Sequence, residues 1–191
     1  MRYSREHKAE THQKIVNDAS RRVRTEGMAG ASVAAVMQDN GLTHGGFYKH
    51  FESKDDLLLE SLHVAFAEIG DRLVQAAEKA PRGSAWKAIV KSYLNAEHCD
   101  HVECGCPLAA LGSELRRTDK GMRAQILREV MQYKSRMVPF MPGRRAEDKE
   151  KAFLSIFSTM IGAIEIARIL PEPAMREGVL ANAREFLLRS F

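Results

Sequence analysis

Residues 31–57 read ASVAAVMQDNGLTHGGFYKHFESKDDL, and this stretch decides the fold. Ser32 is a favourable helix N-cap, and the pair Asn40-Gly41 suits the left-handed conformation that ends a helix. A second short helix is expected to begin after Thr43 and to carry Phe47 on its apolar side. Two short helices joined by a tight glycine turn predict a helix-turn-helix, whose second helix can enter the major groove of DNA.

The rest of the chain also has helical periodicity, and no segment shows the sustained alternation of a strand. We therefore expect an all-α fold. Residues 5–26 form one long amphipathic helix that Gly27 ends, and Ser53 begins another that continues to residue 77. About four helices thus occupy the N-terminal part. Further helices are expected at residues 86–94, 108–117, 120–140, 146–170 and 172–189.

The 191 residues allow one or two compact units, and positive charge is unevenly shared between them. We divide the chain into a helix-turn-helix region, residues 1–54, and a connecting helix with a C-terminal domain, residues 55–191. The first region holds nine Lys/Arg and six Asp/Glu, whereas the second holds twenty and nineteen. This excess is expected of a surface that meets phosphates. Three arginines near the end of the first helix are expected to be solvated or to cap it, with phosphate contact as the alternative: Arg21, Arg22 and Arg24.

The run from Gly41 to Lys54 resembles the signature of TetR-type transcriptional regulators. A glycine, an apolar residue, a Ser/Thr, a tyrosine, a His-Phe pair and a lysine follow at the family's spacing without insertion. The resemblance covers about residues 8–68, including the long first helix and the glycine-rich turn after it. It implies a cytoplasmic, homodimeric DNA-binding repressor, not an enzyme, that a small-molecule effector releases from a palindromic operator. No cofactor is expected.

The resemblance also implies DNA-binding residues. Those at phosphate-contacting positions are Thr43, Tyr48, His50 and Lys54. Those near bases or adjacent backbone are His44, Gly45, Gly46 and Lys49, and Ser32 on the preceding helix completes the set. Two consecutive glycines lower the intrinsic stability of the second helix by roughly 1 kcal/mol each relative to alanine. We expect that helix to order fully only on DNA.

The last two helices carry more apolar residues than the core of one chain can cover. In TetR-type proteins these helices pair across a two-fold axis as a four-helix bundle. The predicted dimer interface is Phe153, Phe157, Met160, Ile161, Ile164, Leu180, Ala183 and Leu187. Residues 152–170 are long enough to suggest a membrane span, but their polar residues favour a buried helix, and the polar N-terminus does not resemble a signal peptide.

The central helices would enclose the effector in a TetR-type protein. Adaptable methionines and aromatic rings suit an apolar guest. The predicted lining is Trp86, Tyr93, Met122, Met131, Tyr133 and Met137. At helical spacing the same residues also fit an ordinary core. None of them identifies the effector, which we expect to be apolar or electrophilic.

Residues 98–106 bring together three cysteines, two histidines and two carboxylates. One interpretation is a tight structural loop with Cys106 packed inside. A second is a thiol sensor of oxidants or electrophiles formed by Cys104 and Cys106, because a helix beginning at Pro107 would lower the thiol pKa. A third is a metal site, with the ligands Cys99, His101, Cys104 and Cys106, in a metal sensor or a metal-handling helical protein. Three cysteines cannot all pair as disulfides, which favours a reducing compartment.

Overall fold

The computed structural model describes residues 5–191, and these residues are 82% helical and contain no strand. The all-α prediction is confirmed. The N-terminal elements are α1 (Arg5–Gly30), α2 (Val33–Asp39), the 3₁₀ helix η1 (His44–Lys49) and α3 (Lys54–Glu78). They are followed by α4 (Ala85–Tyr93), α5 (Ala96–Asp100), η2 (Val102–Cys104), α6 (Pro107–Leu115), α7 (Lys120–Met137), η3 (Val138–Phe140), α8 (Ala146–Ile169) and α9 (Pro173–Ser190).

The N-terminal helices begin and end at the residues that the capping pattern predicts. Gly27 interrupts α1 with a φ of 76°, and Gly41 follows α2 with a φ of 68°. Both values lie in the left-handed region that glycine adopts without a Cβ clash. The Ser32 side chain accepts a hydrogen bond from the Ala35 amide at 3.2 Å, and Ser53 forms a reciprocal capping box at the start of α3.

Two segments differ from the prediction. The second helix of the helix-turn-helix is a 3₁₀ helix of six residues, not an α-helix. Its consecutive glycines, Gly45 and Gly46, have the low helix propensity that explains a short, tighter helix. Residues 96–104 hold two short helices where we expected a connection, because the Asn95 side chain accepts a hydrogen bond from the His98 amide at 2.8 Å and caps α5.

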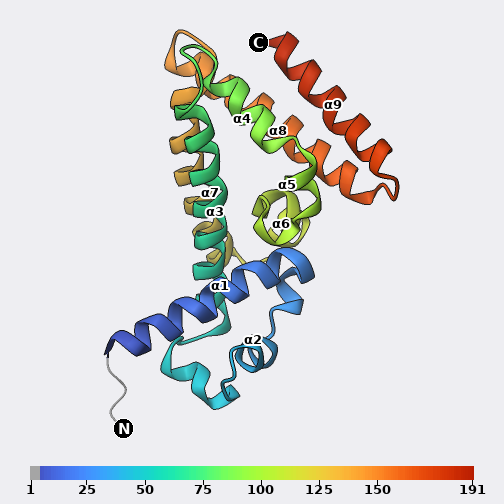
Figure 1. The fold of residues 1–191 in the computed structure, drawn as a ribbon. Coiled ribbons are helices and arrows are strands. Elements are labelled where there is room, and N and C mark those ends of the chain that lie inside the picture. Colours follow the sequence, from blue (N-terminus) through green and yellow to red (C-terminus); the bar gives the residue numbers. More distant parts are fainter. Residues whose placement is uncertain (1–4) are drawn as a thin grey trace.

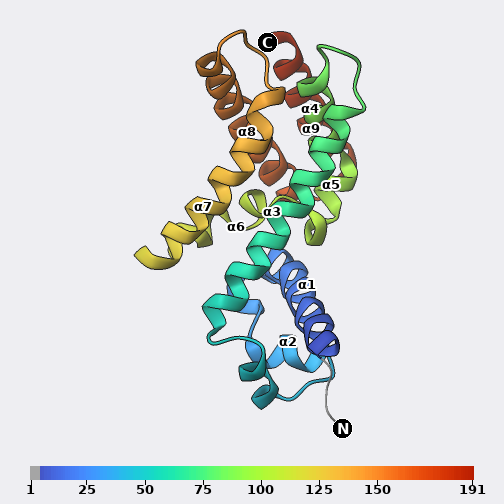
Figure 2. The same cartoon turned by 90° about the vertical axis from the view of Figure 1, so that its left-hand side faces the viewer.

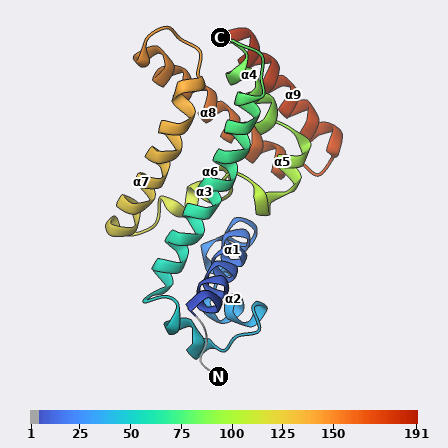
Figure 3. The ribbon, with the colours of Figure 1, turned by 60° about the vertical axis from the view of Figure 1, so that its left-hand side comes forward.

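The helix α3 runs from the N-terminal part to the far end of the molecule, with α1 crossing its lower end (Figure 1). Helix α7 packs along α3, and Figure 2 shows its first turns extending away from the rest. Helices α8 and α9 pack against each other in the upper part of the molecule (Figure 3). The molecule therefore has a helix-turn-helix end and a helical-bundle end joined by α3.

Two clusters of buried apolar residues divide along α3. The N-terminal core includes Leu57, Leu58 and Leu62 of α3, and the C-terminal core includes Ile69 and Leu73. The N-terminal core also takes four residues from α6 and α7: Leu111, Leu115, Met122 and Ile126. The helix-turn-helix end is thus packed partly by residues that are distant in sequence.

Within residues 5–191, α8 is the one helix that is long and apolar enough to cross a membrane. Eight of its residues are buried inside this chain: Ala152, Phe153, Ile156, Phe157, Met160, Ala163, Ile164 and Ala167. Its apolar character is therefore used to build the C-terminal core.

Candidate functional site

The helix-turn-helix presents η1 outward over a packed base. Phe47 is buried and stacks on Phe51, with 5.2 Å between the ring centroids. Tyr48 meets Phe47 edge to face at 5.3 Å but is 68% exposed. Thr43, His44, Gly45 and Lys49 are also exposed along η1. The apolar side of η1 thus fixes its position, while its polar side is open for recognition.

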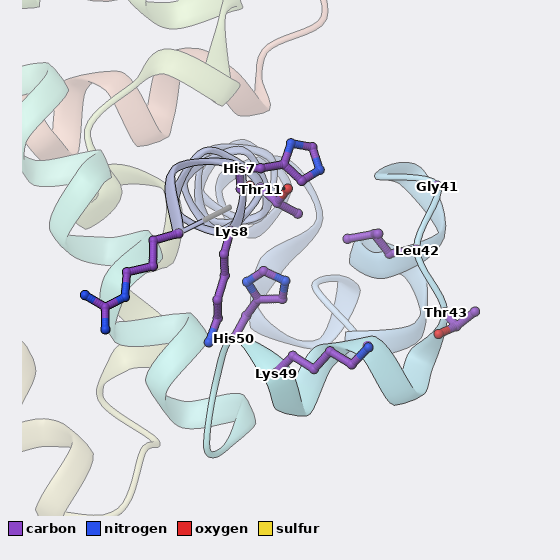
Figure 4. A pocket seen from close by; sticks show the side chains of 10 residues that line it. His7, Lys8, Thr11, Gly41, Leu42, Thr43, Lys49 and His50 are labelled. Atoms are coloured by element: carbon purple, nitrogen blue, oxygen red, sulfur yellow. Dashed lines mark hydrogen bonds between the residues drawn. The ribbon is translucent and has the colours of Figure 1, made fainter. Parts of the chain in front are cut away.

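A cleft separates η1 from the first two turns of α1. Its volume is about 480 Å³, and its walls carry Arg5, His7, Lys8, Thr11, Gly41, Leu42, Thr43, Gly46, Lys49 and His50. Figure 4 shows Lys8 on α1 and His50, which directly follows η1, extending into the same space. Three cations and two hydroxyls on facing walls make this cleft suited to phosphate oxygens. We call it the basic cleft.

His50 lies at the partly buried base of the basic cleft. Burial lowers the pKa of its imidazole, and the nearby positive charges of His12, Lys8 and Lys49 lower it further. Its Nδ1 atom is buried without a hydrogen-bond partner among the described residues. At neutral pH His50 is therefore uncharged and has one ring nitrogen that an incoming group can satisfy.

The structure places the other predicted DNA-binding residues differently. Lys54 donates to the carbonyl oxygen of Met28 at 3.3 Å, and Ser32 is occupied by its capping bond. Gly46 packs close to Met37, since a Cβ at Gly46 would lie 3.5 Å from the Met37 methyl carbon. These contacts stabilise the motif, and DNA contact by the same three residues stays a prediction. The sequence pattern missed Arg5 and Lys8, although the basic composition of the first helix was a signal for them.

Arg24 was expected to be solvated or to cap its helix, and this is wrong because its guanidinium is buried. It donates to Glu68 of α3 at 2.7 Å, to the Ser20 carbonyl at 3.0 Å and to the Gly105 carbonyl at 3.2 Å. Arg21 is exposed, as expected, and Arg22 pairs with Glu26 and Asp39. Arg24 therefore joins the helix-turn-helix end to residues 98–106, which we call the cysteine loop.

The cysteine loop packs around a neutral histidine. The Cys106 amide donates to Nε2 of His98 at 2.9 Å, so Nδ1 carries the proton and donates to the Tyr93 carbonyl at 2.7 Å. Burial lowers the pKa of His98 to about 3. Cys106 itself is buried, and this burial raises the pKa of its thiol. The expected lowering by the start of α6 is therefore overturned, since desolvation outweighs it.

The metal interpretation is not supported either. Among residues 5–191, no three His, Cys, Asp or Glu side chains come together in a group that could hold a metal ion. Cys99 and Cys106 are buried, whereas Cys104 and His101 face solvent. The short helices α5 and η2 turn the four candidate ligands in different directions, which sequence spacing could not reveal.

The predicted effector residues divide among three environments. Tyr93, Tyr133, Met137 and Trp86 belong to the C-terminal core. Met122 lies instead in the N-terminal core, and Met131 is 50% exposed on α7. These two methionines therefore do not line a pocket in the C-terminal core, because the first turns of α7 extend away from the helical bundle (Figure 2).

Unpartnered polar groups mark the C-terminal core. The buried hydroxyl of Tyr133 has no hydrogen-bond partner within the described part of the chain, and the buried hydroxyl of Tyr93 lies beside the weakly bonding thiol of Cys106. Nε of Arg72 is also buried without a hydrogen-bond partner among the described residues. Burial raises the pKa of both tyrosines well above the ordinary value. A buried polar group without a partner costs about 1–3 kcal/mol, so this polar arrangement in a core calls for a functional explanation.

The predicted dimer interface requires a correction. Six of its eight residues are buried inside one chain: Phe153, Phe157, Met160, Ile164, Leu180 and Leu187. The apolar residues that α8 and α9 expose are Leu154, Ile166, Ile169, Met175 and Phe186. Both helices are apolar on two sides, and helical periodicity alone does not tell which side meets the chain's own core. We call these five residues the outer face.

The comparisons with known proteins agree with this geometry. Residues 15–61 match the family described as "Bacterial regulatory proteins, tetR family". The match begins in α1, includes the whole helix-turn-helix and ends in α3. No curated protein matches the chain.

Several solved structures share the whole fold. A TetR transcriptional regulator from Chloroflexus aurantiacus J-10-FL has a TM-score of 0.78 and 22% identity, over 95% of this chain and 94% of that one. A TetR-family regulator from Cytophaga hutchinsonii has a TM-score of 0.76 and 20% identity, with the same coverage of both chains. The reduced form of NemR from E. coli has a TM-score of 0.75 and 16% identity, over 93% of this chain and 95% of that one. The similarity at these identities is one of fold.

Proposed function

We propose that this chain is a TetR-type transcriptional regulator, because residues 15–61 match that family's N-terminal segment and solved TetR regulators share its whole fold, and that it is a repressor which a small molecule releases from its operator. The matched family is one of transcriptional regulators, and its resemblance to residues 15–61 supports regulation through DNA binding. The repressing mode, the effector and the partner surfaces are the proposal, which also places the protein in the cytoplasm.

The single observation that carries DNA recognition is the basic cleft. Lys8 on α1 and Lys49 on η1 both line it, beside the exposed Tyr48 and Thr43. Phosphate contacts from both walls hold η1 in register, and its exposed residues then reach base edges in the major groove. His44 and Gly45, on the open side of η1, are the residues we assign to base or adjacent backbone contact.

The outer face supports a homodimer. Ile169 is 80% exposed and Phe186 is 61% exposed, which is unusual for side chains of this size. Pairing α8 and α9 with their copies covers this face as a four-helix bundle. Two η1 helices about one turn of DNA apart, roughly 34–36 Å, then read the halves of a palindromic operator.

Effector release follows from the sharing of α3 between both cores. A ligand that separates the helices of the C-terminal core displaces α3, and α3 carries Leu57, Leu58 and Leu62 of the N-terminal core. The spacing of the two η1 helices then no longer matches successive major grooves. A coupling free energy of about 1–3 kcal/mol between the two sites is sufficient for such a response.

A cysteine sensor is the alternative, and the geometry does not favour it. The similar NemR structure is of a reduced form, but in this chain Cys106 is buried and its thiol pKa is raised, so little thiolate forms at neutral pH. Replacing Cys104 and Cys106 by serine is expected to leave effector release unchanged. Loss of release in these variants would support the thiol sensor instead.

The decisive experiment is an electrophoretic mobility shift with DNA flanking the protein's own gene. We expect the ligand-free protein to shift a palindromic fragment in a sequence-specific and salt-sensitive manner. A small-molecule extract of the native cell is expected to reverse the shift. A protein that shifts no fragment, or shifts all fragments equally, would refute the repressor proposal.

A further inference from the structure

Four aromatic rings from four different helices meet in the C-terminal core: Phe66 of α3, Tyr93 of α4, Tyr133 of α7 and Phe157 of α8. Tyr93 and Tyr133 both meet Phe157 edge to face, with centroid distances of 6.1 and 5.6 Å. Phe66 lies 5.8 Å from Tyr133. All four side chains are buried. We call this set the aromatic box, and its two tyrosine hydroxyls are its polar groups, with the thiol of Cys106 beside that of Tyr93.

Two guanidinium groups give the surroundings of the aromatic box a positive potential. One terminal nitrogen of Arg72 on α3 donates a hydrogen bond to the Cys104 carbonyl oxygen at 3.3 Å. The buried Nε of Arg72 has no hydrogen-bond partner within residues 5–191. The three hydrogen bonds of Arg168 go to backbone carbonyls, and the carboxylate of Glu165 acts on it only through space. The positive charge of Arg72 favours the ionised form of Tyr133, and that of Arg168 favours the ionised form of Tyr93.

We propose that the aromatic box binds an aromatic ring that carries one carboxylate group. The carboxylate accepts hydrogen bonds from the hydroxyls of Tyr93 and Tyr133 and from Nε of Arg72. The ring of the ligand packs against Phe66 and Phe157. This inference rests on the proposed function, since it names the chemical class of the effector that the C-terminal domain takes.

The polar groups exclude the simpler ligand classes. A purely apolar guest leaves the Tyr133 hydroxyl and the Arg72 Nε unsatisfied, and a cationic guest meets the charges of Arg72 and Arg168. An anionic oxygen satisfies the three donors at once and balances the positive potential. The aromatic walls require that this oxygen belong to a planar, apolar body.

The aromatic box reaches the surface between α3 and α7. A pocket of about 50 Å³ there is lined by Phe66 and Tyr133 together with His63, Ala67, Glu129, Gln132 and Arg136. Two ion pairs span this seam, His63 with Glu129 and Arg136 with Asp71. The pocket is too small for an aromatic acid, so binding requires α3 and α7 to separate. The same movement displaces α3 from the N-terminal core, which links occupancy to DNA release.

Calorimetric titration of the full-length protein with benzoate and with 1-naphthoate tests the ligand class. Benzamide and 1-naphthamide are the matched neutral probes, because they keep the ring and lose the charge. We expect saturable binding of at least one acid, one per chain, at least tenfold tighter than that of its amide. Equal affinities for acid and amide, or no binding of either acid, would overturn the proposal.

Tyrosine-to-phenylalanine variants test the geometry. Tyr133→Phe removes a hydroxyl that has no hydrogen-bond partner in the free protein, and Tyr93→Phe removes one that meets only the weakly bonding thiol of Cys106. We therefore expect a melting temperature that is little changed or higher and an acid affinity at least tenfold weaker. Arg72→Gln is expected to abolish the preference for acid over amide. Its matched control, Arg128→Gln on the exposed side of α7, is expected to keep that preference. A lower melting temperature with unchanged acid affinity would show a structural role and contradict the site.

The same titrations separate this proposal from the proposed function. If neither acid binds but cell extract still reverses the DNA shift, effector release stands and the aromatic-acid class is wrong. If an acid binds through Tyr93 and Tyr133 but the protein stays on its operator, the site stands and effector release by this route is wrong.

Discussion

The guanidinium of Arg24 donates a hydrogen bond to the carbonyl oxygen of Gly105 across 3.2 Å, and these residues are 81 positions apart. Arg24 lies on α1 beside the helix-turn-helix, whereas Gly105 precedes the buried Cys106. Arg24 also reaches Glu68 on α3 at 2.7 Å. One buried side chain therefore holds α1, α3 and the cysteine loop in a fixed relation.

Replacement of Arg24 by lysine is expected to destabilise the fold although it keeps the charge. A lysine ammonium cannot serve the Ser20 and Gly105 carbonyls and Glu68 in the planar geometry that the guanidinium provides. We expect the free energy of unfolding to fall by about 1–3 kcal/mol, as measured by urea denaturation. Arg21→Lys, on the exposed side of the same helix, is the control and should change it little. Equal effects of both variants would contradict the assignment.

Charge removal in the basic cleft is expected to weaken DNA binding without changing its sequence preference. Lys8→Ala and Lys49→Ala each remove one phosphate contact per chain, so the slope of log affinity against log salt falls by about 1 for each half-site. Mobility shifts at several salt concentrations measure this slope. Lys91→Ala, exposed on α4, is the matched control. An unaltered slope in both cleft variants would remove the cleft from the DNA-binding surface.

DNA affinity is expected to rise as the pH falls from 7 toward 5.5. Burial and the nearby charges of His12, Lys8 and Lys49 lower the pKa of His50 in the free protein, so its imidazole is neutral at pH 7. A DNA phosphate in the cleft favours the protonated form, and binding therefore takes up a proton. His50→Gln should reduce this pH dependence, whereas His101→Gln on the exposed cysteine loop should not. An unchanged pH dependence in His50→Gln would contradict a phosphate contact there.

Acid is expected to destabilise the C-terminal core through His98. Its pKa is about 3 in the folded protein, below the ordinary 6.5 that it regains on unfolding. The stability that His98 contributes by staying neutral is therefore complete above pH 6.5 and is lost as the pH falls toward 3. At pH 5 the loss is about 2 kcal/mol. His98→Gln should remove this part of the difference between urea curves at pH 7 and pH 5. A difference as large as in the unmodified protein would show that His98 is not its source.

A charge on the outer face is expected to prevent dimerisation without unfolding the chain. Ile169→Glu and Phe186→Glu each place a carboxylate in the apolar centre of the proposed bundle, which should weaken association by roughly 2 kcal/mol or more. Sedimentation velocity measures the state of association, and circular dichroism confirms that the helices remain. Leu127→Glu, at another exposed apolar residue on α7, is the control. Dimers of unchanged affinity in both α8–α9 variants would place the interface elsewhere.

Helical periodicity identified nearly all of the long helices, because buried residues recur every three or four positions regardless of what covers them. The same property explains the error at the dimer interface. Phe157 and Leu180 face inward and Ile169 and Phe186 face outward, yet all are equally apolar in sequence. The side that is covered depends on where the neighbouring helices lie, which is a long-range property.

The sequence alone determined the helix-turn-helix, its capping residues Ser32 and Ser53, and the glycine turn at Gly41, because these depend on interactions within four or five residues. Only the tertiary structure brought Arg5 and Lys8 opposite η1, buried Arg24 against Gly105, and placed Tyr93 and Tyr133 in one core. Each of these arrangements joins helices that are distant along the chain. Their positions follow from the packing of all the helices together, which no local pattern contains.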